Sequence, residues 1–109
     1  MIKFRVFDKR YHKYLTQYTI DNMIWYALNS NDYIVELATG LFDGAGIEIY
    51  DGDILQDDDG YLWVVSYSND DAMFQLNDET VSENFENVSS TWFMIVGNVN
   101  ENKEVLKWK

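Results

Sequence analysis

Hydrophobic and polar residues alternate along much of the chain, and an alternation of two is the period of a half-buried β-strand. At the N-terminal end Ile2, Phe4 and Val6 alternate with Lys3 and Arg5, which predicts a strand over residues 1–7. Runs of β-branched and aromatic residues bounded by polar clusters predict further strands. These lie at 11–20, 33–39, 47–49, 61–67, 72–76 and 91–99.

The residue patterns of two stretches fit more than one kind of secondary structure. In 21–29, Asp21 is placed to cap a short helix, but the aromatic residues that follow suit a strand or hairpin equally well. In 77–90, three isolated apolar residues recur at spacings of four and three, which fits a short amphipathic helix or a loop with aromatic anchors. Those three residues are Val81, Phe85 and Val88.

Glycine and aspartate mark a set of tight turns in 39–55, which holds four of the six glycines. Glycine adopts positive φ without steric cost, and aspartate side chains bond the backbone of their own turn. A Gly-Asn step near the C-terminal end predicts a bulge or a close backbone approach. The residues predicted to fix these turns are Gly40, Asp43, Gly46, Gly52, Asp53, Gly97 and Asn98.

Three blocks in this order carry a family resemblance. They are 1–9, the Thr-Gly-Leu, Asp-x-x-Gly, Glu-Ile-Tyr and Gly-Asp-Ile elements of 39–55, and 96–102 with its Val-Gly-Asn step. Together they resemble the YopX family of phage and prophage proteins. The resemblance implies a β-rich fold and a phage or prophage origin. It implies no activity, because the family has no established biochemical function.

The order of turns, hairpins and strands predicts a single YopX-like domain over 1–109 that is mainly β. We expect a small SH3-like barrel over 39–99, an N-terminal β-rich segment over 1–38, and a tail over 100–109 that docks through its apolar residues. At most one or two short helices are expected. The barrel is an analogy of fold and carries no function with it.

Composition narrows the class of protein. The chain has 109 residues, of which 47% are hydrophobic, so it can bury one small core. It has no cysteine for disulfides or thiolate metal sites, and no apolar run approaches the ~20 residues that span a membrane. No signal peptide is recognised. We therefore expect a cytoplasmic location in an infected or lysogenic bacterial host.

Charge is segregated along the chain, whose net charge is -11. All eight Lys and Arg residues lie near the two ends. All of the 19 acidic residues except Asp8 and Glu104 lie in 14–102, so that stretch holds 17 acids and no base. Such a stretch repels nucleic acid and anionic membranes. We expect no direct binding to either, and a partner with a basic surface: a second copy of the chain, in a homo-oligomer, or a basic host protein.

The basic and apolar residues of the two ends are the candidates for such an interface. They are Lys3, Arg5, Lys9, Arg10, Lys103, Leu106, Lys107 and Trp108.

Acidic residues are the candidates for catalysis. The aspartates of 51–59 offer oxygen ligands, but their spacing fails the EF-hand pattern, and nothing selects two carboxylates as a glycosidase pair. His12 is the sole histidine and is expected at the surface. No catalytic, cofactor or metal residue is assigned. The expected function is a non-enzymatic, self-associating binding protein; the alternatives are an acidic mimic of nucleic acid that inhibits a host DNA-binding protein and a metal-dependent hydrolase.

Aromatic residues make up 17% of the chain, and the barrel region holds many of them. They fit a face that stacks bases, but no flanking Lys or Arg completes such a face. Core packing is the alternative, with some of them lining a pocket or an interface, where Tyr and Trp are enriched. The residues concerned are Tyr61, Trp63, Tyr67, Phe74, Trp92 and Phe93.

Overall fold

The computed structural model describes residues 3–85 and 88–106, and within them the chain is mainly β with one α-helix. This confirms the predicted fold class. The chain divides into two compact units, Met1–Ala38 (unit 1) and Thr39–Lys109 (unit 2). Each unit has its own hydrophobic core.

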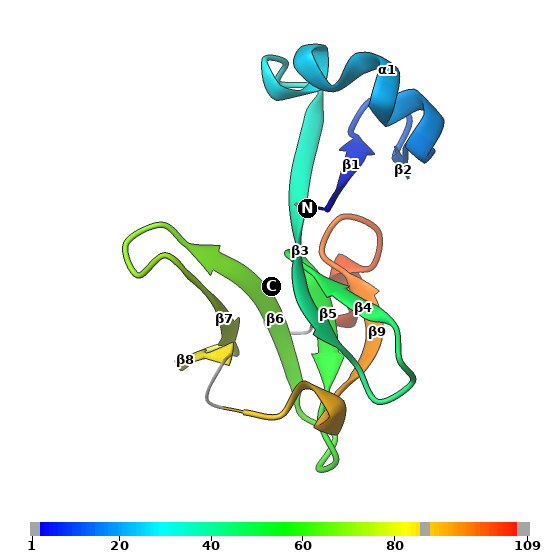
Figure 1. Cartoon of the computed structure of the whole chain (residues 1–109). Helices are drawn as coiled ribbons and strands as arrows, with labels where there is room; N and C mark the ends of the chain where they lie inside the picture. Colours follow the sequence, from blue (N-terminus) through cyan, green and yellow to red (C-terminus); the bar gives the residue numbers. More distant parts are fainter. Residues whose placement is uncertain (1–2, 86–87, 107–109) are drawn as a thin grey trace. The chain divides into compact units, whose positions relative to one another are not determined.

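Unit 1 is a small antiparallel sheet with one helix (Figure 1). Strand β1 (Phe4–Asp8) pairs with β2 (Lys13–Tyr14) on one side and with the first half of β3 (Tyr33–Phe42) on the other. Helix α1 (Gln17–Leu28) contacts β1. The buried core of the unit consists of Val6, Ile20 and Ala27.

The predicted strand over 11–20 is wrong beyond Lys13–Tyr14, because α1 begins at Gln17. The cap of the helix is Thr16, whose hydroxyl accepts the backbone N–H of Thr19 at 3.3 Å. Asp21 therefore lies inside the helix rather than at its cap, although the helical alternative for 21–29 is confirmed. Burial of one helical face outweighed the β propensity of the local Tyr and Thr residues.

Unit 2 is built on a five-stranded antiparallel sheet whose order is β8-β7-β6-β5-β9. Figure 1 shows this sheet curling from β9 at one edge to β8 at the other, like half of a barrel. The second half of β3 pairs with β4 (Glu48–Tyr50). The five strands are β5 (Asp53–Gln56), β6 (Leu62–Ser68), β7 (Met73–Asn77), β8 (Ser82–Asn84) and β9 (Met94–Asn98).

The core of unit 2 contains six buried side chains from β4 to β9. They are Ile49, Leu55, Val65, Leu76, Phe85 and Phe93. Strands predicted at 47–49, 61–67 and 72–76 are confirmed with small shifts at their ends. The strand predicted over 91–99 begins only at Met94, because Ser90–Trp92 forms a 3₁₀ turn, η2.

The helix considered for 77–90 is absent from the described part of that stretch. Its first half is a turn and β8, and Phe85 is 1% exposed and anchors it in the core. The alternative of a loop with aromatic anchors fits the described part of this stretch better, with Phe85 as an anchor. A second 3₁₀ turn, η3 (Lys103–Val105), lies in the predicted tail and is followed by the buried Leu106.

Candidate functional site

The Asp43 carboxylate joins two parts of unit 2. Its Oδ1 accepts the backbone N–H groups of Ala45 and Ile47, both at 2.9 Å, and its Oδ2 accepts that of Ile95 at 3.1 Å. Burial raises the pKa of the Asp43 carboxyl, but the backbone N–H bonds from Ile47, Ile95 and Ala45 outweigh it and hold the pKa below 3.8. Asp43 thus binds the β3–β4 turn to β9 and has a structural role.

The other predicted turn residues are structural as well. Gly40, Gly46 and Gly52 have φ between 79° and 91°, which favours glycine. The carboxylate of Asp53 is buried and accepts the backbone N–H of Tyr50 at 2.7 Å. These residues shape the unit and present no chemistry to solvent.

The Gly97-Asn98 step is a bulge with a close approach. Ile54 pairs with Gly97 but Leu55 pairs with Ile95, so one residue of β9 is left over between them. A Cβ on Gly97 would lie 2.8–2.9 Å from the side chain of Asn102. The Asn98 side chain accepts the N–H groups of the two residues at 100 and 101, at 3.1 and 2.9 Å.

The basic residues expected at an interface divide into two groups. In unit 1, Arg5 Nε lies 2.7 Å from Glu36 Oε1, and Arg10 Nε lies 3.5 Å from Asp8 Oδ1. These two arginines are therefore engaged within their own unit. Lys3, Lys9 and Lys103 are exposed, Leu106 is only 2% exposed, and Lys107 and Trp108 lie outside the described residues.

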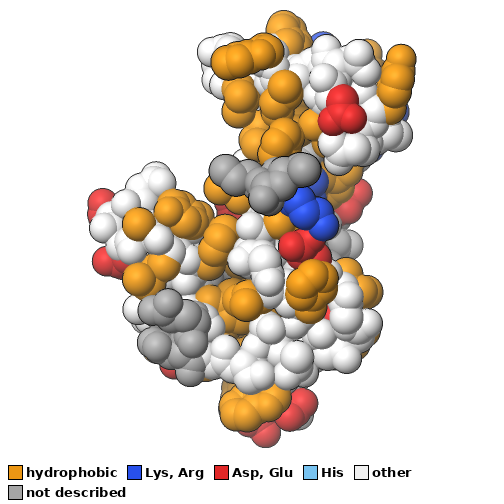
Figure 2. All heavy atoms as spheres, viewed as in Figure 1, with side chains coloured by type: hydrophobic (Ala, Val, Ile, Leu, Met, Phe, Trp, Pro, Cys, Tyr) orange, Lys and Arg blue, Asp and Glu red, His pale blue; other side chains and the backbone are white. Residues whose placement is uncertain are grey.

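The structure brings the acidic β5–β6 turn together with aromatic residues from distant parts of unit 2. They line a pocket of about 270 Å³. Figure 2 shows acidic (red) and hydrophobic (orange) side chains side by side at the bottom of the view, where this turn lies. The lining residues are Asp57, Asp58, Asp59, Trp63, Leu76, Glu83, Val88, Trp92 and Phe93. We call this the acidic-aromatic pocket.

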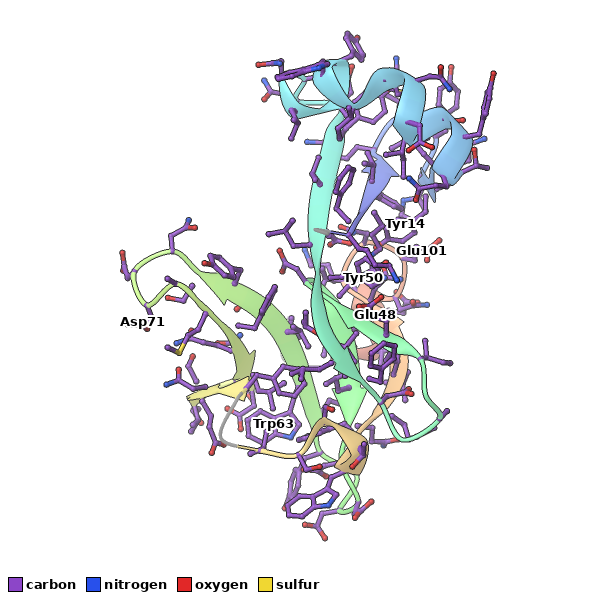
Figure 3. The ribbon with its side chains drawn as sticks, in the orientation of Figure 1. Tyr14, Glu48, Tyr50, Trp63, Asp71 and Glu101 are labelled. Atoms are coloured by element: carbon purple, nitrogen blue, oxygen red, sulfur yellow. The ribbon has the colours of Figure 1, made fainter. Side chains whose placement is uncertain are left out.

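Asp57 organises one wall of the acidic-aromatic pocket. Its Oδ1 accepts the backbone N–H groups of Asp59 at 3.0 Å and Tyr61 at 2.9 Å, which closes the hairpin turn at Gly60. Its Oδ2 accepts the indole Nε1–H of Trp63 at 3.1 Å. Figure 3 labels Trp63 on β6. The turn and the indole ring are therefore fixed to each other by one carboxylate.

The rim of the acidic-aromatic pocket is exposed and negatively charged. Asp58, Asp59 and Glu83 are exposed, and Trp92 is 64% exposed, whereas Phe93 is only 6% exposed and belongs to the core. No residue of unit 2 before Lys103 is Lys or Arg. The arrangement offers apolar walls and clustered carboxylates, and this combination suits the binding of an organic cation.

The sequence indicates each half of this pocket separately. The aspartates are candidate metal ligands, and Trp63, Trp92 and Phe93 are candidates for base stacking, the core or a pocket. The signal that joins Asp57 to Trp63 is their position in one hairpin, six residues apart. No sequence signal places Trp92 and Phe93 against that hairpin, because η2 is distant along the chain.

Other pockets are formed by described residues of unit 2. One of about 370 Å³ adjoins the same β5–β6 turn and is lined by Tyr61, Asp78 and Val105, among others. Another, of about 300 Å³, is mainly apolar and includes Leu41, Tyr67 and Phe74. Neither combines several carboxylates with tryptophan, so the acidic-aromatic pocket is the candidate site.

Two other structural observations concern metals and membranes. Within residues 3–85 and 88–106, no three His, Cys, Asp or Glu side chains are grouped so that they could hold a metal ion. In the part of the chain that the structure describes, no helix has the length and hydrophobicity needed to cross a bilayer.

Comparison with known families identifies the chain. The family model described as YopX protein matches residues 19–107. The chain belongs to the YopX family. This confirms the resemblance seen in the sequence, and the match includes every residue of the acidic-aromatic pocket of this YopX chain. No match was found among curated proteins.

A solved structure shares the fold of this YopX chain. The crystal structure of protein EF1440 from Enterococcus faecalis superposes with a TM-score of 0.67 at 19% sequence identity, and the similarity covers 97% of this chain and 98% of that chain. At this identity the likeness shows a common fold alone.

Proposed function

We propose that this YopX protein is a non-enzymatic binding protein whose unit 2 docks onto a basic protein surface. The observation that carries the proposal is the acidic-aromatic pocket, which places carboxylates and tryptophans together in a unit with almost no bases. In unit 2, three Lys residues stand against fifteen Asp and Glu residues, which gives a net charge of -12. A surface of this charge attracts cationic partners and repels anionic ones.

Pairing of charges inside unit 1 favours a different protein over a second copy as the partner. Five Lys and Arg residues there stand against four acids, so unit 1 has a net charge of +1. Arg5 and Arg10 already pair with Glu36 and Asp8. Two copies of a chain whose net charge is -11 also repel each other. Self-association through the basic ends is therefore the weaker form of the proposal.

Calorimetric titration with an arginine-rich peptide tests the proposal. We expect binding at about 50 mM salt that weakens strongly at about 300 mM, because exposed charges are screened over a shorter distance. A glutamate-rich peptide of equal length is the control and should not bind. If the basic peptide gives no heat and no saturable signal at the lower salt concentration, the proposal is wrong.

Two further measurements separate the alternatives. Light scattering coupled to size exclusion should give the mass of a monomer, whereas a stable dimer at low salt that dissociates at high salt would favour self-association. Competition by double-stranded DNA for a captured basic host protein would favour the narrower role of nucleic-acid mimic. Lack of any competition would leave only the general proposal of a basic partner.

A further inference from the structure

Resting on the proposed function, we infer that the acidic-aromatic pocket is the site that receives an arginine side chain of the basic partner. The ligand class is a guanidinium carried on an aliphatic stem. The pocket volume of about 270 Å³ is just below the range typical of cofactor and drug-sized sites, and it suits one long side chain.

Apolar groups line the pocket along its depth. Leu76 and Phe93 are buried core residues, and Val88 is half-buried beside them. Arginine covers such surfaces with its methylene groups while its charged head stays at the rim. The apolar lining therefore suits the methylene groups of an arginine, and the charged rim suits its guanidinium head.

Tryptophan and carboxylate groups at the rim match the guanidinium head. Trp63 and Trp92 offer indole rings, which are the preferred aromatic partners of cations. Asp58, Asp59 and Glu83 add exposed carboxylates. A planar guanidinium stacks on an aromatic face and donates several hydrogen bonds in one plane, whereas an ammonium offers a single point charge. This geometry favours arginine over lysine.

Preorganisation lowers the cost of binding. The bond from Trp63 Nε1 to Asp57 Oδ2 and the two backbone bonds to Asp57 Oδ1 hold one wall in place before any ligand arrives. A rigid site loses less side-chain entropy on binding than a flexible one.

Charge-matched double variants provide the first test. Asp58→Asn/Asp59→Asn removes two carboxylates from the pocket, and Asp70→Asn/Asp71→Asn removes two from another hairpin turn, where both residues are also exposed. Each pair changes the net charge equally. Binding is measured with a fluorescently labelled peptide of alternating Arg and Ser. We expect Asp58→Asn/Asp59→Asn to weaken the binding of this peptide about tenfold and Asp70→Asn/Asp71→Asn to weaken it about twofold.

An aromatic pair provides the second test. Trp92→Ala and Trp25→Ala each remove an exposed tryptophan, 64% and 79% exposed, one at the pocket and one on α1. We expect Trp92→Ala to weaken binding about fivefold and Trp25→Ala to leave it unchanged. If Trp92→Ala lowers the melting temperature, Trp92→Leu takes its place, because it keeps an apolar side chain but removes the aromatic ring and should still weaken binding; unchanged affinity would contradict the role of Trp92.

Each outcome separates this inference from the proposed function. Equal weakening by the two charge-matched pairs would overturn the pocket as the arginine site while the acidic surface remained a binding surface. A second peptide of alternating Lys and Ser, equal in length and charge, should bind more weakly than the Arg and Ser peptide, and equal affinity for the two would overturn the guanidinium assignment. A wild-type protein that binds neither peptide would instead overturn the proposed function itself.

Discussion

The two units of this chain stabilise a buried carboxylate in different ways. In unit 1, Glu36 is 3% exposed and accepts hydrogen bonds from Arg5 at 2.7 Å and from the Tyr14 hydroxyl at 2.9 Å. In unit 2, Asp43 is 2% exposed and accepts three backbone N–H groups. Glu36 is therefore paired with a cation, whereas Asp43 is stabilised by peptide N–H groups.

This difference connects structure with the proposed function. A protein that compensates each acid with a base has little charge left for a partner. In unit 2, Asp43, Asp53 and Asp57 each accept backbone N–H groups and so fix turns of the chain. The exposed carboxylates of Asp58, Asp59 and Glu83 give the rim of the acidic-aromatic pocket a negative field, which is the basis of the proposed binding.

The largest expected effect on stability comes from removing the Asp43 carboxylate of unit 2. Asp43→Ala leaves the N–H groups of Ala45, Ile47 and Ile95 without their shared acceptor, and we expect the free energy of unfolding to fall by about 3–5 kcal/mol. Urea denaturation followed by circular dichroism measures it. Asp70→Ala, at an exposed turn, is the control and should change stability by less than about 0.5 kcal/mol. A similar small loss for both variants would contradict the role of Asp43.

A somewhat smaller loss is expected in unit 1. Glu36→Ala removes the carboxylate that Arg5 and Tyr14 contact, and breaking such a pair costs about 3 kcal/mol. The double variant Arg5→Met/Glu36→Leu should recover much of that loss, because an apolar pair can replace a buried ion pair. Failure of the double variant to exceed the single variant in stability would show that the two residues act separately.

Acid should affect both units, with different dependence on salt. The folded-state pKa of Asp43 is lowered, so its contribution is fully present above about 3.8, the unfolded value, and is lost as the pH falls through the folded value. The pKa of Asp8 is also lowered: burial raises it, but the backbone N–H groups of Arg10 and Tyr11 and the guanidinium of Arg10 outweigh this. Asp43→Asn should flatten the stability curve below about pH 4 at any salt concentration. For Asp8→Asn, the change in the pH dependence of stability should become smaller as salt is added, because salt screens the ion pair between Asp8 and Arg10.

The smallest predicted effect concerns one turn in each unit. Ala72 and His12 have φ of 53° and 54°, which glycine adopts more easily. Ala72→Gly should stabilise the protein by about 0.5–1 kcal/mol by relieving this strain. His12→Gly should gain less, because it also loses an edge-on contact with Phe7 at 5.3 Å between ring centres. Thermal unfolding of both variants measures the difference, and a loss of stability in Ala72→Gly would contradict the argument.

Local patterns predicted a large part of unit 2. Alternation located β6 and β7, and Asp-Gly steps located the turns, because these features depend on neighbouring residues alone. The error at α1 arose because burial of Ile20 and Ala27 against β1 depends on contacts that local propensity does not encode.

Only some parts of the candidate site could be predicted from the sequence. The hairpin at Asp57 follows from its sequence, but the approach of Trp92 and Phe93 depends on the 3₁₀ turn η2 and on Gly44, whose N–H donates to the carbonyl of Phe93 at 2.9 Å. A Cβ on Gly44 would lie 2.9 Å from the Thr91 carbonyl oxygen. Such close packing between distant segments leaves no periodic signal in the sequence.

The measurement that tests the central claim most directly is a nuclear magnetic resonance titration of the whole chain with the arginine-rich peptide. The indole N–H signals report on both units, since Trp63 and Trp92 lie in unit 2 and Trp25 lies in unit 1. We predict saturable shifts of the Trp63 and Trp92 indole signals and of the backbone signals of 57–61, with the Trp25 signal unchanged. Shifts confined to residues 3–38, with the signals of Trp63 and Trp92 unmoved, would contradict the account.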